Sequence, residues 1–214
     1  KLIKEKLAKG YRAGDSSPGY SATTADKQHS GIQCQLLNPI EEKEAEALLT
    51  HPGYLMQEKM DGRRLLIKKA GDNISGINRL GFTISVPDMI VRSAAKHDGD
   101  YILDGEAVDD TLHVFDLLAI GGEDMRTHGF LDRHLRLQVL LNAFYHPHIK
   151  IVCTHFAPQK AGWYSQLKRE GKEGVVFKHV DAPYVPGKPN AGGPQLKFKF
   201  YETASFIVTK VNDK

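Results

Sequence analysis

The chain has 214 residues, of which 41% are hydrophobic and 26% are charged, a balance typical of a globular protein with a substantial core. Its formal net charge is only +3, so any contact with nucleic acid has to come from local basic patches. The two cysteines, Cys34 and Cys153, form no CxxC pattern, which argues against a zinc ribbon or a disulfide framework. They indicate a reducing, intracellular location, cytoplasmic or nuclear. No apolar run approaches the ~18 residues of a membrane span.

The first part of the chain offers little to bury. Residues 1–12 are basic, with a small apolar face made by Leu2, Ile3 and Leu7, and residues 14–30 are rich in small and polar side chains. We therefore expect residues 1–30 to be a basic N-terminal segment and a linker. Because the chain begins with Lys1 rather than methionine, we expect it to be part of a longer protein.

Residues 31–203 predict one folded domain in which many strands are interrupted by a few helices. Helices are expected at 41–49, 88–97, 132–145 and 160–170, and the third has Leu135, Val139, Leu140 and Phe144 on its expected apolar face. Short apolar runs predict strands at 54–59, 63–69, 74–79, 82–86, 101–103, 112–120, 149–156, 173–178, 195–201 and 206–211. This order predicts an α+β fold with mixed, largely antiparallel sheets and flanking helices.

One stretch between two predicted strands joins a lysine to acidic and basic neighbours: Gln57, Glu58, Lys59, Met60, Asp61, Gly62, Arg63 and Arg64. Asp61-Gly62 is a hairpin dipeptide, so Lys59 is expected to end one strand and Arg64 to begin the returning strand. A free lysine is almost fully protonated at neutral pH. Partial burial, a neighbouring cation such as Arg64 or a nearby magnesium ion would favour the nucleophilic neutral amine. A surface hairpin with ordinary charges is the alternative interpretation.

Carboxylates mark two strands in the middle of the chain. Asp104-Gly105-Glu106 follows an apolar run, which predicts two carboxylates at the C-terminal edge of a strand. Asp116 lies inside the apolar sequence VFDLL, and a buried carboxylate is costly unless it has a fixed partner. The DGE sequence alone is equally consistent with an ordinary turn at a strand edge.

Two late strands carry the remaining charges. Glu173 opens the strand EGVVFK, which closes with Lys178, and this pattern also fits an ordinary strand edge. Lys197 and Lys199 alternate with phenylalanines in LKFKF, so the two lysines are expected on one face of a strand. Such a face suits a phosphate, although an exposed strand face gives the same pattern.

Taken in order, these clusters resemble the motifs of the covalent nucleotidyltransferases, which include ATP-dependent DNA ligases, RNA ligases and mRNA-capping guanylyltransferases. KMDGRR is similar to the family pattern KxDGxR, and NRLG, beginning at Asn78, is similar to the basic motif that follows. DGE, FDLL, EGVVFK and LKFK resemble the remaining motifs, so the resemblance covers residues 57–199. It implies the ATP-grasp-like nucleotidyltransferase fold of a ligase adenylation domain.

The resemblance further implies ATP and Mg²⁺ as cofactors. Lys59 would attack the α-phosphate of ATP, carry AMP as a phosphoramidate and pass it to the 5′-phosphate of nicked duplex DNA. Lys197 and Lys199 would neutralise the α-phosphate in the transition state, and Glu106 and Glu173 would hold magnesium. By motif position, the nucleotide-binding residues are Gln57 at the purine edge, Phe115 stacked on the purine, Arg64 and Glu106 at the ribose, Arg79 at a phosphate, and Glu58 and Lys178.

The sequence departs from the family pattern at two places. Asn78 stands where the family usually has serine, and no OB-fold domain follows the lysine pair. Residues 204–214 are expected to begin a linker or an OB-fold domain that lies beyond the chain. The chain alone is therefore expected to self-adenylylate weakly or not at all and to seal nicks poorly.

The forms of two motifs, EGVVFK and FDLL, favour a DNA ligase over its relatives, and residues 6–12 resemble the tail of a DNA-associated WGR domain. The alternatives are an RNA ligase, an mRNA-capping guanylyltransferase, or a nucleic-acid-binding relative without catalysis.

Overall fold

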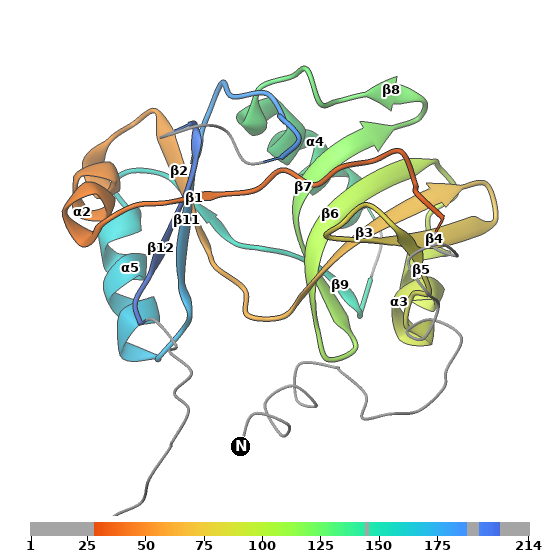
Figure 1. The fold of residues 1–214 in the computed structure, drawn as a ribbon, viewed down its shortest axis with the longest axis horizontal. Coiled ribbons are helices and arrows are strands. Elements are labelled where there is room, and N and C mark those ends of the chain that lie inside the picture. The colour runs from red at the N-terminus through yellow and green to blue at the C-terminus, as the bar shows by residue number, and fades with distance from the viewer. Residues whose placement is uncertain (1–27, 144–145, 188–192, 202–214) are drawn as a thin grey trace, which may run out of the picture.

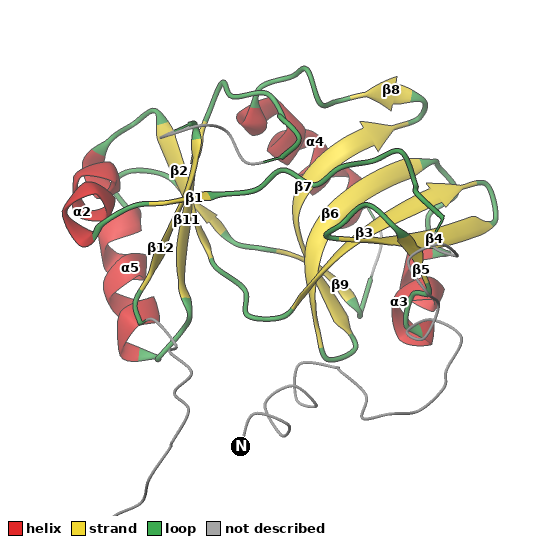
Figure 2. Cartoon of the chain, in the orientation of Figure 1, coloured by secondary structure: helices red, strands yellow, loops and turns green. Residues whose placement is uncertain are grey.

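The computed structural model describes residues 28–143, 146–187 and 193–201, which form two β-sheets with helices packed on their outer faces (Figure 1). The predicted strand at 206–211, Phe144, the WGR-like residues and nearly all of the expected linker lie outside these ranges. Helices and strands alternate irregularly along the chain (Figure 2). The described helices are α2 (Glu42–Thr50), α3 (Asp88–Ala94), α4 (Phe130–Asn142) and α5 (Lys160–Arg169).

The first sheet has five strands in the order β1-β12-β11-β2-β10, and the second has seven. The five are β1 (Asn38–Pro39), β2 (Tyr54–Glu58), β10 (Thr154–His155), β11 (Gly174–His179) and β12 (Gln195–Lys199). The seven are β3 (Arg63–Ala70), β4 (Asn73–Asn78), β5 (Thr83–Ile84), β6 (Tyr101–Val108), β7 (Thr111–Ile120), β8 (Glu123–Asp124) and β9 (Ile149–Ile151). Among the described strand pairs only β1–β12 and β7–β9 are parallel. The predicted α+β fold with mixed, largely antiparallel sheets is therefore confirmed.

The five-stranded sheet has one apolar and one polar face, because side chains alternate along each strand. Met56, Phe177 and Leu196 lie opposite one another across β2, β11 and β12. All three belong to the core cluster that includes Ala45 of α2 and Leu167 of α5. The intervening residues of the same strands therefore point to the opposite face, away from the two helices.

The seven-stranded sheet is covered by helices on one face in the same way. Leu65 and Ile67 of β3 belong to a core cluster with Ile90 of α3 and Leu137 of α4. Leu66, between them in sequence, belongs instead to a cluster on the other face. Each sheet thus buries one face under its helices and turns the other toward its neighbour.

The apolar face predicted for α4 is wrong in part. Leu135 and Val139 are 50% and 75% exposed, whereas Leu140 is buried as predicted. The buried stripe has the spacing of one helix face and consists of Phe130, Arg133, His134, Leu137, Leu140 and Leu141. The arginine and histidine inside this stripe concealed the true face from a reading of apolar residues alone.

The predicted hairpin at Asp61-Gly62 is also wrong. β2 and β3 belong to different sheets, so residues 59–62 cross from one sheet to the other. The backbone N–H of Lys59 still donates to Gly174 O of β11, whereas Arg63 already pairs with Ala107 of β6. Gly62 is required for space: a Cβ there would overlap Ala107 O.

Two further strand boundaries differ from expectation. β6 runs through Asp104-Gly105-Glu106 instead of ending before it, because these residues pair with β3 on one side and β7 on the other. The strand predicted at 149–156 is divided into β9 and β10, which belong to different sheets.

Among residues 28–143, 146–187 and 193–201, no helix has the length and apolar character needed to cross a membrane.

Replacing Gly62 by alanine should destabilise the fold by ~1–3 kcal/mol, because the new methyl group would displace the backbone of β6. Gly162→Ala is the matched control, since that glycine lies inside α5 with open space around it. It should be neutral or stabilising by ~0.5–1 kcal/mol. Urea unfolding followed by circular dichroism measures both free energies; equal stabilities of the two variants would contradict the crowding at Gly62.

Candidate active site

A cleft with a volume of about 390 Å³ lies between the inner faces of the two sheets. Of the predicted site residues, all line the cleft except Glu173 and Lys199: Gln57, Glu58, Lys59, Arg64, Arg79, Glu106, Phe115, Lys178 and Lys197. The sheets contribute opposite walls, β2, β11 and β12 on one side and β3, β6 and β7 on the other. The structure therefore brings together motifs that are spread over the sequence.

Strand register explains the first wall. Thr154, Gln57, Val176 and Lys197 lie directly opposite one another across β10, β2, β11 and β12, so their side chains share one face. Lys199 lies two residues beyond Lys197 on the same face, while Phe198 packs on the helix side with Tyr164. The predicted common face of the two lysines is thereby confirmed.

Lys59 lies at the end of β2, with its amine held by a carboxylate. Its Nζ is 2.6 Å from Oε2 of Glu173, and Lys199 Nζ is 3.0 Å from the other oxygen of the same carboxylate. The Lys59 and Glu173 side chains are 19% and 11% exposed, so Lys59 is partly buried, one of the conditions that favour a neutral amine. Lys199 is a cation beside this amine, since both lysines contact Glu173, while the guanidinium of Arg64 pairs with Asp104.

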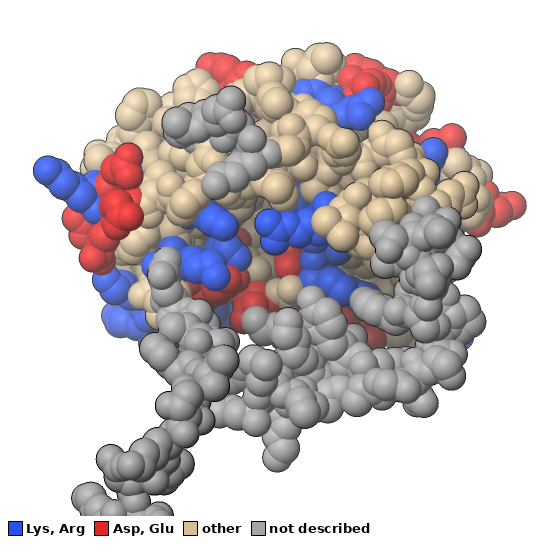
Figure 3. Space-filling view, in the orientation of Figure 1, with Lys and Arg blue, Asp and Glu red and all other residues tan. Residues whose placement is uncertain are grey.

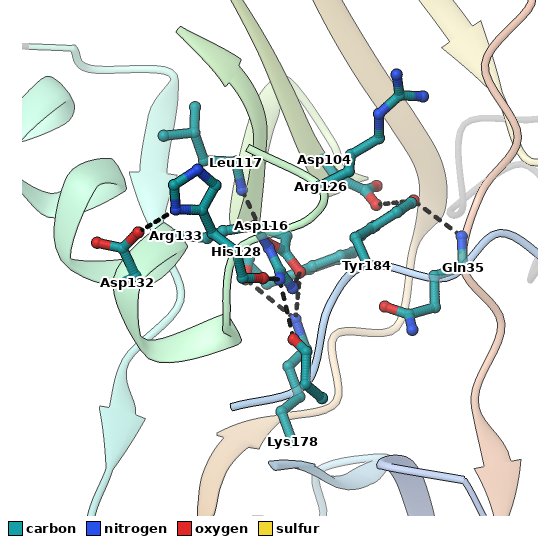
Figure 4. A network of polar contacts seen from close by, with 12 residues as sticks. Gln35, Asp104, Asp116, Leu117, Arg126, His128, Asp132, Arg133, Lys178 and Tyr184 are labelled. Atoms are coloured by element: carbon teal, nitrogen blue, oxygen red, sulfur yellow. Dashed lines mark hydrogen bonds and ion pairs between the residues drawn. The ribbon is translucent and has the colours of Figure 1, made fainter. Parts of the chain in front are cut away.

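Arg64 is bound by Asp104 through two parallel hydrogen bonds of 2.6 Å each. Burial by itself lowers the pKa of Arg64, but the Asp104 carboxylate raises it above its ordinary value. The hydroxyl of Tyr184 donates to Asp104 at 2.8 Å and accepts the backbone N–H of Gln35, also at 2.8 Å. Tyr184, from a loop distant in sequence, thus holds the carboxylate that binds the guanidinium at the cleft wall. Figure 4 shows Tyr184 between Asp104 and Gln35.

Asp116 has the fixed partners that its apolar surroundings predicted. Arg133 of α4 donates to its two oxygens at 2.7 and 3.0 Å, and Lys178 of β11 approaches to 3.5 Å (Figure 4). Burial would raise the pKa of Asp116, but Lys178 and Arg133 lower it below its ordinary value. Burial also lowers the pKa of Lys178 to about 8, against the opposing effect of Asp116.

Phe115 reaches the cleft because β7 bulges there. Asp104 pairs with Asp116 whereas Gly105 pairs with Val114, so Phe115 is an extra residue in β7. Its ring centroid lies 4.7 Å from the Arg64 guanidinium carbon and 4.8 Å from Lys178 Nζ. The ring therefore already faces two cations.

Asn78, the departure from the family motif, shapes the turn that carries Arg79. Its side-chain oxygen accepts the backbone N–H groups of Leu80 and Phe82 at 2.9 and 3.1 Å. Gly81 completes the turn with a φ of +84°, a conformation that glycine adopts without strain. Asn78 is therefore explained by the turn, and Arg79 lies exposed at the cleft mouth.

The cleft is richer in basic than in acidic side chains. Its basic residues are Lys59, Arg63, Arg64, Arg79, Lys178 and Lys197, and its acidic residues are Glu58, Asp104, Glu106 and Asp116. Lysine and arginine side chains gather near the middle of the molecular face in Figure 3, between the two sheets. Such a surplus favours an anionic ligand.

Glu106 is the acidic residue whose protonation is most altered near neutral pH. Burial raises its pKa from the ordinary 4.5 to about 7, although Arg64 and Lys59 oppose the shift.

The described residues contain no cluster of three or more histidine, cysteine, aspartate or glutamate side chains that could hold a metal ion. Magnesium usually takes only one or two carboxylates from a protein and the rest of its ligands from phosphates and water. Glu106 and Glu173 are compatible with that role, but both Glu173 oxygens face lysines here. These two carboxylates therefore fit a magnesium ion that takes most of its ligands from phosphate and water better than one surrounded by protein ligands.

The sequence analysis missed four residues of this site. Gln35, Tyr184 and Thr154 lie outside the motifs, and no local sequence pattern indicates that they belong to the site. Arg133 could have been found from the sequence, because it interrupts the apolar stripe of α4. A charged residue on a buried helix face indicates a buried partner, here Asp116.

Replacing Glu106 by glutamine should flatten the pH dependence of stability. The folded pKa of about 7 lies above the ordinary 4.5, so the folded state binds the proton more tightly and stability falls as pH rises through this window. Between pH 5 and 7.5 the wild type should lose ~1–3 kcal/mol more free energy of unfolding than Glu106→Gln. Urea titrations at both pH values measure this loss, with Glu46→Gln, at an exposed position of α2, as control. An equal change in the free energy of unfolding for wild type and Glu106→Gln would show that Glu106 is ionised over the whole range from pH 5 to 7.5.

Curated relatives of this sequence are DNA ligases. The chain is 27% identical over 193 residues to a DNA ligase of Methanocorpusculum labreanum, covering 75% of this chain and 34% of the relative. It is 30% identical over 186 residues to a probable DNA ligase of Beutenbergia cavernae, covering 72% and 35%. The chain thus spans about a third of the length of these relatives. No protein-family model matches the sequence.

Solved structures with the same fold include ligases. A mycobacterial DNA ligase D complexed with ATP and MES has a TM-score of 0.64 at 20% identity, covering 80% of this chain and 61% of that one. The ATP-dependent DNA ligase of bacteriophage T7, in complex with ATP, has a TM-score of 0.52 at 18% identity, covering 78% and 68%. The sequence is thus similar to DNA ligases, and its fold is that of solved DNA ligase structures, two of them determined with ATP.

Proposed function

We propose that this chain is the adenylating part of an ATP-dependent DNA ligase, and that Lys59 is its nucleophile. The observation that carries the proposal is the position of the Lys59 amine. It lies in a basic cleft, partly buried, with Glu173 at 2.6 Å and the Lys197 strand on the same wall. The DNA ligases among the sequence relatives favour this reaction over RNA sealing or capping.

The first step would join AMP to Lys59. The neutral Nζ attacks the α-phosphorus of ATP, a phosphorus–nitrogen bond forms, and the bond to the β-phosphate oxygen breaks. Pyrophosphate leaves with that electron pair. Glu173 is within hydrogen-bond distance to accept the proton that Nζ loses. Lys197 and Lys199, on the same face of the sheet, would balance the charge that develops at the α-phosphate.

The purine would lie between the two sheets, with Phe115 on one side and Val176 on the other. Both residues line the cleft, and Val176 is the register neighbour of Gln57, which would meet the purine edge.

The polar end of the nucleotide would lie toward the cations of the cleft. Arg64 and Glu106 line the part of the cleft proposed for the ribose, and the exposed Arg79 lies at the mouth, where phosphates would be. Glu58 and Lys178 complete the proposed nucleotide site.

Magnesium, when bound, would neutralise phosphate charge and stabilise the leaving pyrophosphate. Glu106 and Glu173 are the proposed protein ligands. Glu173 would have to exchange one lysine contact for the ion, since its two oxygens face Lys59 and Lys199.

The later steps would act on nicked duplex DNA. A 5′-phosphate oxygen attacks the α-phosphorus, the bond to Lys59 breaks, and the amine regains a proton. The 3′-hydroxyl then attacks the activated 5′-phosphate and releases AMP. We propose residues 31–203 as the adenylation domain, after the basic segment and linker of residues 1–30. A further OB-fold domain, beginning after residue 203, would be required for efficient sealing.

Incubating the protein at its natural full length with magnesium and ATP labelled at the α-phosphate should leave label on the protein after denaturation. ATP labelled at the γ-phosphate should leave none, because pyrophosphate departs. Lys59→Ala should abolish the label, since no other group takes the place of its amine. Autoradiography of a denaturing gel measures the result.

Lys68→Ala is the matched control, because Lys68 is an exposed lysine of β3 outside the cleft. It should label like the wild type. Persistent labelling of Lys59→Ala would assign the nucleophile to another residue. Nucleotide binding without covalent label in the wild type would favour a non-catalytic relative.

A further inference from the structure

Gln57 reaches the cleft with only one end of its amide available. The side chain is 1% exposed, and its Nε2 donates to Oγ1 of Thr154, the opposite residue on β10, at 2.9 Å. Its carbonyl oxygen, Oε1, makes no hydrogen bond to the part of the chain that the structure describes. A ligand in the cleft therefore meets an acceptor at this position.

Thr154 determines which end of the amide is available. Its hydroxyl lies 3.3 Å from Val152 O, to which it donates. A hydroxyl has a single proton, so once Oγ1 donates to Val152 it can only accept from Gln57. Turning the amide over would place two acceptors against each other and leave a buried polar group without a partner.

An acceptor at the purine edge distinguishes two kinds of base. Adenine carries an amino group at position 6, which donates, whereas guanine carries an oxygen there, which accepts. We infer that Thr154 makes the cleft selective for a 6-amino purine by holding the Gln57 carbonyl toward the base. The inference rests on the proposed nucleotidyl transfer and adds a positioning residue that touches no ligand itself.

The experiment compares covalent labelling by α-labelled ATP and GTP in the protein at its natural full length. Thr154→Val has the same shape but no hydroxyl, so the amide is free to turn and present Nε2 to the guanine oxygen. The ratio of kcat/KM for ATP over GTP should fall about tenfold, mainly through a gain with GTP. A merely structural role of Thr154 would lower both values together and leave the ratio unchanged.

Two further variants separate orientation from packing. Thr154→Ser keeps the hydroxyl and should keep the wild-type ratio. Gln57→Glu provides acceptors at both ends, so adding Thr154→Val to it should leave the ratio unaltered. If the ratio falls equally with valine in both backgrounds, Thr154 does not act through the amide.

Equilibrium binding of ATP and GTP to the same variants measures the selectivity between the two nucleotides independently of the covalent step. An unchanged ATP-to-GTP ratio in Thr154→Val, in labelling or in binding, overturns the role of Thr154. So does a wild type that binds both nucleotides equally. A wild type that prefers ATP in binding but never becomes labelled overturns the proposed nucleotidyl transfer instead.

Discussion

The buried contact between Asp116 and Lys178 joins the two sheets of this protein. One residue comes from β7 of the seven-stranded sheet and the other from β11 of the five-stranded sheet, and both are buried. Buried charges are tolerated only when their hydrogen-bonding groups are satisfied. Arg133 meets that requirement by binding Asp116 and by donating to the carbonyls of His128 and Ala182. This buried group therefore links the two sheets at the wall of the cleft, which Asp116 and Lys178 both line.

The same separation of the sheets explains the chemistry available in the cleft. In the five-stranded sheet, residues between those that pack on the helices point into the cleft. There they lie opposite Arg64, Glu106 and Phe115 of the seven-stranded sheet. Glu173 lies between the amines of Lys59 and Lys199, and its negative charge allows two cations to lie close together without a ligand. An incoming phosphate would find both lysines already arranged on one side of it.

Much of the fold was predictable because its signals are local. Short apolar runs predicted the strands, and the resemblance of the ordered motifs to a known family predicted which residues share a site. Nine of those eleven residues line one cleft. The wrong predictions concern features that depend on contacts between residues distant in the sequence. Asp61-Gly62 has the composition of a hairpin, yet β2 and β3 find their partners in different sheets, and Gly62 serves close approach to Ala107. The buried face of α4 was predicted wrongly because Arg133 lies on it, where it pairs with Asp116, 17 positions earlier in the chain.

The sequence by itself determined the α+β class, the strands that carry the motifs, and the lysine on which the proposed chemistry depends. The class and the strands follow from the pattern of apolar and polar residues, and the choice of lysine follows from the resemblance of the motifs to those of the covalent nucleotidyltransferases. Only the tertiary structure decided that Glu173 contacts Lys59, that Tyr184 donates to Asp104 while accepting from Gln35, and that Thr154 accepts from Gln57. Each of those contacts joins residues that are distant in the chain, and their geometry depends on how two sheets pack, which no short stretch of sequence encodes.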